Sequence, residues 1–310
     1  MRFEVTVLGS SSAVADNRKH HSAHVLNARE QFYLIDCGEA TQIQLRRYGV
    51  NPLKINHIFI SHLHGDHVFG LPGMISTLGF MGKRTPLHIY APSPITKYVE
   101  YHKELFESEL AYEIVVHEVN NTEHQLIYEN KVLEVWSIPL RHSVATSGYL
   151  FREKVPPLNV RKDCIERYGL TPQEIVAIKA GSPLRLENGE VVDNELLTYL
   201  PYKPRSYAYC SDTSASGRVA EIVSGVDLLY HEATFAEDQH TMARKTGHST
   251  ARQAAKIAAQ AGVGRLLIGH HSSRYKTSDV LLAEAREIFP DTLDAVEGEI
   301  FKIDLVQTKL

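Results

Sequence analysis

The densest group of chemically capable side chains is the run HLHGDH at residues 62–67, which holds three histidines and an aspartate. Imidazole nitrogen and carboxylate oxygen are ligand types that zinc accepts. His62 and His64 are two residues apart in an extended loop and can bind one ion, whereas Asp66 and His67 are adjacent, point differently and can serve a second. A surface loop that happens to hold three histidines is the alternative. We interpret the run as a metal site whose spacing favours two ions.

Further residues of metal-binding type follow other predicted strands. The strand predicted at residues 55–61 leads into the run, and later strands precede the remaining candidates, which are His142, Asp212 and His270. Because the strands of α/β layers gather their ends along one edge, we expect these side chains to meet there. The expected ligands of the first ion are His62, His64 and His142. Those of the second ion are Asp66, His67 and His270. Asp212 is the expected bridge, since a carboxylate has two oxygens to divide.

Length and charge set limits on the protein's size and partners. At 310 residues, the chain exceeds one typical domain length but fits one large layered domain with an insertion. The formal net charge is -4 and the sequence pI is near 6.5, which argues against a protein coated in basic surface. A nucleic-acid partner would therefore be held by a local basic patch or by the metal ions themselves.

The cysteines and the apolar segments indicate the cellular compartment. Cys37, Cys164 and Cys210 are odd in number and far apart, which speaks against a disulfide framework and for a reducing compartment. The first residues read as a strand entering a turn rather than as a secretory signal. No apolar run approaches the membrane-spanning length of about 18 residues. We expect a soluble cytoplasmic protein with no membrane partner.

Apolar periodicity predicts alternating strands and helices around a polar first loop that carries Arg18 and Lys19. The predicted strands are residues 3–8, 25–26, 31–35, 55–61, 87–91, 112–119, 132–138, 148–151, 206–211, 226–230, 265–269 and 299–305. The predicted helices are residues 40–48, 70–78, 95–106, 162–168, 251–261 and 278–288. Ser249 or Thr250 can cap the helix at 251–261.

Residues 152–205 differ in character from the rest of the chain. Prolines interrupt a mixed-charge stretch that holds one plausible helix, at residues 162–168, and little strand pattern. Such a segment inside a βα-patterned chain is typical of an insertion that projects from the core. A long loop folded back on the body is the alternative. We expect a body formed by residues 1–151 and 206–310, with 152–205 as a protruding arm.

The candidate ligands carry a family resemblance. The HLHGDH run, with the later His142, Asp212 and His270, resembles the metallo-β-lactamase superfamily, which implies an α/β fold, an αββα sandwich with a zinc pair at one edge. More narrowly, six segments resemble the ribonuclease Z family in its short form. They are residues 34–42 (LIDCGEATQ), 59–72 (FISHLHGDHVFGLP), 211–213 (SDT), 231–235 (HEATF), 248–250 (HST) and 270–275 (HHSSRY). The similarity covers nearly the whole chain.

The resemblance implies an activity and its partners. It implies a zinc-dependent endoribonuclease that cleaves precursor tRNA on the 3′ side of the acceptor stem and leaves a 3′-hydroxyl. It also implies two Zn²⁺ per subunit, although imidazole and carboxylate ligands accept Mn²⁺ or Fe²⁺ as well. The family acts as a homodimer, in which the arm of one subunit, here residues 152–205, holds the tRNA elbow for the other subunit's site.

The resemblance and the local chemistry together suggest roles for further residues. Asp66 is by resemblance the general base, which orients the attacking water as well as ligating metal. We hypothesise that His248 protonates the departing ribose oxygen and that Glu232 orients its ring. A helix-start residue without chemical work is the alternative for His248. Arg274 and Ser272 could bind a substrate phosphate, although a solvated surface arginine is almost as consistent with the sequence.

Two other functions remain open from the sequence. A phosphodiesterase of the same fold acting on small substrates would use the same metals, but a small molecule needs no distant clamp, and the insertion at residues 152–205 argues against it. A binding module with a structural zinc site fits poorly, because such sites are closed tetrahedra usually rich in cysteine. Here Cys210 alone lies near a candidate ligand.

Overall fold

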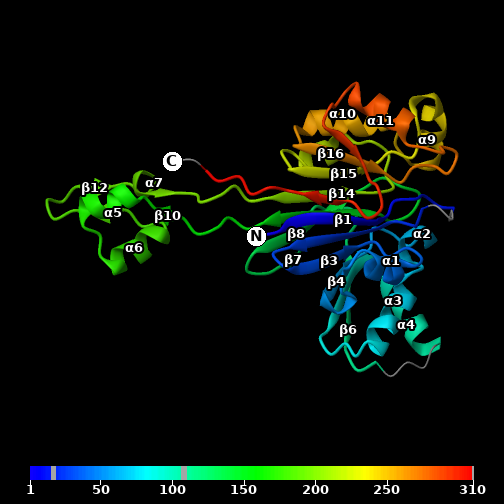
Figure 1. Cartoon of the computed structure of the whole chain (residues 1–310), viewed down its shortest axis with the longest axis horizontal. Helices are drawn as coiled ribbons and strands as arrows, with labels where there is room; N and C mark the ends of the chain where they lie inside the picture. The colour runs from blue at the N-terminus through cyan, green and yellow to red at the C-terminus, as the bar shows by residue number, and fades with distance from the viewer. Residues whose placement is uncertain (15–18, 106–109, 309–310) are drawn as a thin grey trace.

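The computed structural model describes residues 1–14, 19–105 and 110–308. Arg18 of the polar first loop and Phe106, the last residue of a predicted helix, lie outside this range. Within it, two seven-stranded sheets pack face to face and helices cover both outer faces (Figure 1). This is the predicted αββα sandwich. None of the described helices is both long and apolar enough to cross a membrane.

The first sheet combines antiparallel and parallel strands. Its spatial order is β18 (Ile300–Lys302), β1 (Phe3–Gly9), β2 (Ala23–Ala28), β3 (Gln31–Ile35), β4 (Ile55–Phe59), β5 (Leu87–Pro92) and β6 (Ile114–Val119). The strands from β3 to β6 run parallel. The helices between these strands are α1 (Thr41–Arg47), η1 (Pro52–Lys54), α2 (Gly65–Val68), α3 (Leu71–Phe80) and α4 (Ile95–Leu105).

The second sheet supplies the other half of the sandwich. Its spatial order is β17 (Thr292–Asp294), β16 (Arg265–Gly269), β15 (Leu228–Glu232), β14 (Ser206–Cys210), β9 (Ser147–Glu153), β8 (Leu133–Pro139) and β7 (Leu126–Glu129). The strands from β14 to β17 run parallel. The helices in this part of the chain are α8 (Gly217–Ile222), η2 (Glu237–Gln239), α9 (His240–Thr246), α10 (Ala251–Ala261) and α11 (Asp279–Arg286).

Strand alternation divides the core into layers. Successive side chains of a strand point to opposite faces of the sheet. In β14, Tyr207 and Tyr209 therefore point into the aromatic layer between the sheets, whereas Ala208 and Cys210 pack against the helices. Tyrosine hydroxyls also form hydrogen bonds between the two sheets: the Tyr149 hydroxyl of β9 donates to the carbonyl of Ile60, directly after β4, at 2.6 Å. These buried bonds hold the two sheets in one register.

The ends of the parallel strands meet at one edge, as the sequence predicts. Asp36 and His270 directly follow β3 and β16, and Asp212 lies two residues past the end of β14. Their φ angles are 56° for Asp36, 60° for His270 and 49° for Asp212. Residues other than glycine rarely adopt this left-handed backbone conformation, so these turns are strained. Backbone strain of this kind clusters at functional sites. The strained turns mark the edge that carries the candidate ligands.

Several local predictions need correction. Asp66 and His67 lie on the short helix α2, whereas the sequence predicts a loop between the strand at 55–61 and the helix at 70–78. His231 and Glu232 are the last residues of β15, although the sequence predicts a strand that ends before them. The sequence patterns do not predict the edge strands β7 and β17 or the helices α8 and α9. Short edge elements take their structure from their neighbours, so their own patterns carry little signal.

The helix at 251–261 has its predicted bounds. Thr250 is its cap: the Thr250 hydroxyl accepts from the Gln253 N–H at 3.2 Å, and the Gln253 side chain accepts from the Thr250 N–H at 2.9 Å. This capping box satisfies two of the N–H groups that a helix start leaves free. The alanines of α10 pack against the second sheet.

Residues between β9 and β14 form a small unit that projects from the sandwich (Figure 1). Its elements are β10 (Asn159–Val160), α5 (Lys162–Tyr168), α6 (Pro172–Lys179), β11 (Leu184–Arg185), β12 (Val191–Val192), α7 (Asn194–Leu197) and β13 (Thr198–Tyr199). It has its own core, which is Val160, Cys164, Leu170, Ile178, Leu184, Val192 and Leu197. The unit is more structured than its sequence predicts: α6 begins at Pro172, and Thr171 and Glu174 form a capping box at its start.

A buried charge cluster lies where the arm joins the sandwich. The Arg205 guanidinium donates to both carboxylate oxygens of Glu153, at 2.8 and 2.9 Å, and Arg29 donates to the same carboxylate at 2.9 Å. Glu153 and Arg205 are 2% and 3% exposed. Burial raises the pKa of Glu153, but the hydrogen bonds from Arg205 and Arg29 outweigh it and hold that pKa below its usual value.

We predict that Glu153→Gln lowers the free energy of unfolding at neutral pH by about 3–5 kcal/mol, because it leaves the buried Arg205 charge unpaired. A lowered folded-state pKa contributes stability above the unfolded-state pKa, and this contribution is lost as pH falls through the folded-state value. The difference between wild type and variant will therefore shrink in acid. Denaturant unfolding from pH 7 to pH 3 measures it.

The matched control is Glu129→Gln, which removes a half-exposed carboxylate paired with Lys154. Exposed ion pairs contribute about 0–1 kcal/mol. Equal effects of the two substitutions would contradict the importance of the Glu153 cluster.

Candidate metal centre and active site

Three imidazole nitrogens face one another at the shared edge. His62 Nε2 lies 3.0 Å from His64 Nδ1, and His142 Nε2 lies 3.3 Å from the same His64 atom. Asp212 Oδ2 lies 3.5 Å from His62 Nε2 and 3.6 Å from His142 Nε2. Four potential ligand atoms therefore surround one point.

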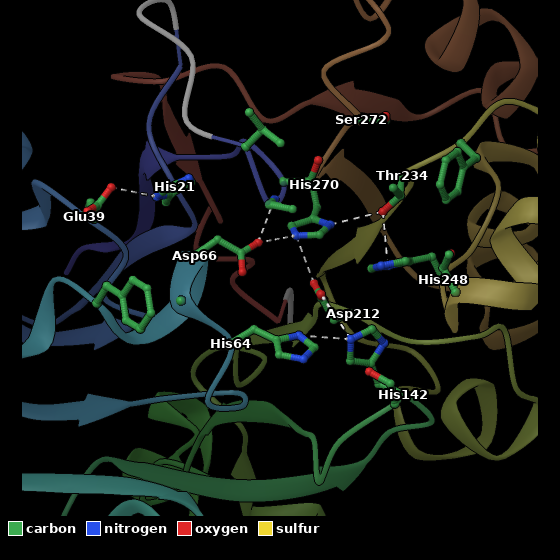
Figure 2. A pocket seen from close by; sticks show the side chains of 18 residues that line it. His21, Glu39, His64, Asp66, His142, Asp212, Thr234, His248, His270 and Ser272 are labelled. Carbon is green, nitrogen blue, oxygen red and sulfur yellow. Dashed lines mark hydrogen bonds and ion pairs between the residues drawn. The ribbon is translucent and has the colours of Figure 1, made fainter. Parts of the chain in front are cut away.

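A second group lies beside the first. Asp66 Oδ2 lies 3.4 Å from His67 Nε2 and 3.3 Å from His270 Nε2. Asp212 Oδ1 lies 3.3 Å and 3.1 Å from the same two nitrogens. One oxygen of Asp212 thus faces each group, as Figure 2 shows for Asp66, His270, His142 and Asp212. The structure brings together all seven residues that the sequence selects as ligands.

This geometry fits metal binding. A tetrahedral ion with ligands at about 2.0–2.1 Å separates its ligand atoms by about 3.3 Å, and the contacts of both groups cluster around that value. His67 Nε2 is also a buried nitrogen without a hydrogen-bond partner. A buried, unpaired polar atom is costly unless a ligand satisfies it. The donor set of imidazole and carboxylate suits zinc, manganese or iron.

Asp36 orients His67, a role the sequence did not reveal. Asp36 Oδ2 accepts from His67 Nδ1 at 2.7 Å and from the Tyr209 hydroxyl at 2.7 Å. The Ser61 hydroxyl and backbone N–H also donate to the Asp36 carboxylate, at 3.0 and 2.7 Å. The LIDCG segment indicated family membership but not this contact, because Asp36 and His67 meet only through the fold. Carboxylates in this position set the ring orientation of metal-bound histidines.

Two further histidines are oriented in the same way. His142 Nδ1 lies 3.0 Å from the carbonyl of Gly247, and His270 Nδ1 lies 3.1 Å from the Thr234 hydroxyl. Each contact uses the ring nitrogen that points away from the cluster. The nitrogens facing the cluster are therefore left for a metal ion.

Charges in the cluster compensate one another. Burial lowers the pKa of His67, but the carboxylates of Asp212, Asp36 and Asp66 outweigh it and raise that pKa well above its usual value. Burial raises the pKa of Asp66, yet His67 and His270 outweigh it and lower that pKa. Asp66 is therefore held as an anion, which suits a metal ligand and a hydrogen-bond acceptor.

His248 and Glu232 form a pair beside the ligand groups. His248 Nδ1 donates to Glu232 Oε1 at 2.8 Å. Glu232 is held in turn by the Thr213 N–H at 2.9 Å and the Thr234 hydroxyl at 2.6 Å. Burial lowers the pKa of His248, but Glu232 outweighs it and raises that pKa to about 9. His248 thus keeps a proton at neutral pH.

His248 also lies close enough to Asp212 and His270 to form a third possible ligand group. Asp212 and His270 already serve the other two groups, and the His248 ring is bound to Glu232 through Nδ1. We therefore place His248 outside the ligand set.

The clusters form the floor of a cavity of about 900 Å³. Asp66, Asp212, His248 and Ser272 are among the residues that line it. Arg274 is not among them. Its guanidinium lies 4.9 Å from the ring centre of Phe235, which does line the cavity, and donates to Gln239 at 2.8 Å.

The sandwich and the two ligand clusters at its edge define a metal-dependent hydrolase of the metallo-β-lactamase class. Ribonuclease Z of Bacteroides fragilis is 43% identical over 297 residues, which are 96% of this chain and 98% of that protein. Ribonuclease Z of Porphyromonas gingivalis is 44% identical over 303 residues, which are 98% and 99% of the two chains. The chain belongs to the ribonuclease Z family.

Comparisons with solved structures agree. The short form of human tRNase Z superimposes with a TM-score of 0.71 at 25% identity and covers 97% of this chain and 99% of its own. YhfI of Bacillus subtilis, a metallo-β-lactamase fold protein, has a TM-score of 0.68 at 17% identity, with 97% and 100% covered, and shows the fold alone. A family model described as anti-Pycsar protein Apyc1 matches residues 3–145, less than half of the chain.

We predict that Asp36→Asn weakens metal binding by about 10–100-fold, because an amide orients the His67 ring less strongly than a carboxylate does. Competition with a chelator, followed by measurement of metal per chain, tests this. Tyr209→Phe, which removes one bond to Asp36, is expected to have a smaller effect in the same direction. Unchanged affinity in a folded Asp36→Asn variant would show that the contact does not support the metal.

Proposed function

We propose that this chain removes the 3′ trailer from precursor tRNA by hydrolysing one phosphodiester bond with two zinc ions, leaving a 3′-hydroxyl on the tRNA. Mn²⁺ or Fe²⁺ could replace zinc. The observation that carries the proposal is the pair of ligand groups that share Asp212 at the floor of one cavity, in a chain of the ribonuclease Z family. Two ions held by these ligand groups would lower the pKa of a water molecule and neutralise charge on the scissile phosphate.

The proposed roles of the remaining side chains follow from their positions. Asp66, an anion at the cavity floor, accepts a hydrogen bond from the attacking water and orients it. His248 carries a proton and lines the same cavity, so it protonates the departing ribose oxygen. Glu232 orients the His248 ring from behind the cavity. A proton donor on one side and an oriented water on the other is what in-line displacement requires.

Ser272 and Arg274 are the proposed phosphate contacts. Ser272 lies on the cavity wall, and the Arg274 side chain donates to its hydroxyl at 3.2 Å. The Arg274 guanidinium is exposed beyond the wall, where it can meet a neighbouring phosphate of the same RNA strand.

The arm, residues 152–205, is proposed to bind the tRNA elbow in a homodimer, where it serves the partner's active site. Its independent core and its projection from the sandwich support this assignment. The three cysteines, Cys37, Cys164 and Cys210, are all unpaired, which supports a location in the reducing cytoplasm.

We expect purified protein to cut a 3′-extended precursor tRNA once, next to the discriminator base, and to lose this activity with a chelator. Mapping of product ends at nucleotide resolution measures it. Restoration by added Zn²⁺, compared with Mn²⁺ and Fe²⁺, identifies the metals that support cleavage. Failure to cut by protein that holds two metals per chain would favour a small-substrate phosphodiesterase instead.

His248→Ala is expected to lower kcat on precursor tRNA by about 10²–10⁴-fold, because a positioned proton donor contributes that much. Metal per chain is expected to stay at the wild-type value, since His248 lies outside the ligand set. His240→Ala is the matched control, because His240 starts α9 and does not line the cavity. A loss of metal in the His248 variant would make this residue structural.

A further inference from the structure

The arm is connected to the sandwich by two linkers that differ in their contacts with the rest of the protein. The outgoing linker, residues 154–158, contains Pro156 and Pro157, which have no N–H to donate, and it forms no strand. The return linker, residues 200–205, leads into β14. Single extended linkers are flexible, so some further contact must fix where the arm points.

A segment from elsewhere in the chain makes that contact. Residues 304–307, here named the tail segment, follow β18 and run beside the return linker (Figure 1). The Lys203 N–H donates to the Val306 carbonyl at 3.0 Å, and Tyr202 and Gln307 form an antiparallel bridge. The tail segment is therefore paired with the return linker through an isolated β-bridge.

The same part of the return linker is held from its other sides. The Arg29 guanidinium donates to the Tyr202 hydroxyl at 2.6 Å and lies 5.5 Å from the centre of its ring. The Lys203 ammonium pairs with Asp227 at 3.1 Å. Arg205 donates to the carbonyl of Ile303, directly before the tail segment, at 3.3 Å. Residues near both sheets thus contact Tyr202, Lys203 and Arg205 of the return linker.

We infer that the tail segment, together with Tyr202, positions the arm relative to the active site that the arm serves. This inference rests on the proposed tRNA-binding role of the arm. A tRNA is held at two points, its elbow on the arm and its cleavage site in the active site. Once the arm has bound the elbow, the effective concentration of the cleavage site at the active site depends on how stiff the arm's linkers are. Pairing with the tail segment stiffens the return linker, and its loss lowers that effective concentration.

The test compares truncation after Ile303 with truncation after Thr308, which keeps every described contact of the tail segment. Three substrates separate the effects: full precursor tRNA, an acceptor-stem hairpin with the same trailer but no elbow, and bis(p-nitrophenyl) phosphate. We expect truncation after Ile303 to raise KM for full precursor tRNA by about tenfold. The hairpin, the small ester and metal per chain are expected to match the control.

Hydrogen exchange of the Lys203 amide gives a readout without RNA. Truncation after Ile303 is expected to speed this exchange, because it removes the Val306 acceptor. Tyr202→Phe, which removes only the bond from Arg29, is expected to raise KM for precursor tRNA less than the truncation does. Deletion of residues 156–201 sets the upper limit, since it removes the arm.

Two results would overturn the inference. Faster Lys203 exchange with unchanged kinetics on precursor tRNA would mean that the tail segment pairs with the linker but does not position the arm. An equal fall on all three substrates would mean that it supports the sandwich instead. The proposed function fails differently: wild-type protein would then cleave the small ester but neither RNA.

Discussion

The register between the two sheets is the constraint on which the metal centre depends. His62, His64, Asp66 and His67 follow β4 of the first sheet, whereas His142, Asp212 and His270 follow strands of the second. Neither sheet alone holds a complete ligand set. Tyr149 and Tyr209 of the second sheet reach the carbonyl of Ile60 and the carboxylate of Asp36 in the first, and these buried hydrogen bonds join the two halves next to the ligands. A slip of one sheet against the other would separate Asp212 from His62 and His67, which follow β4 of the opposite sheet.

The ligand residues of this centre are buried, so their charges must be compensated within the protein. His62, His67, Asp212 and His270 are at most 2% exposed. Placing several ionisable groups where water is excluded is costly unless each is paired. The carboxylates compensate the imidazoles in part, and His67 Nε2 lies near the Asp66 and Asp212 carboxylates without a hydrogen bond to either. A bound cation therefore completes the charge balance. The same interaction between the cation and the buried ligands sets the geometry for hydrolysis and stabilises this edge of the two sheets.

Function is divided between two parts of the chain with different physical properties. The sandwich is rigid because aromatic and aliphatic layers fill the space between its sheets and helices. The arm has a small core of its own and is connected through linkers that depend on contacts with Glu153, Arg29 and the tail segment. The reaction centre can thus be preorganised while a distant binding surface is set by a few hydrogen bonds at the arm's base.

The sequence alone determined the fold class, the family and the identity of the metal-type side chains, since these depend on local periodicity and on residue types at short spacing. The strand at 265–269 and the helix at 251–261 have their predicted bounds because each carries strong local signals, an apolar run and a capping threonine. Only the tertiary structure revealed Asp36, Thr234 and Tyr209 as supports of the site, and the pairing of the tail segment with the arm's return linker. These residues act through partners far away in the chain, such as Asp36 on His67 and Val306 on Lys203. Such pairs leave no local pattern, because the packing of the two sheets decides which side chains meet.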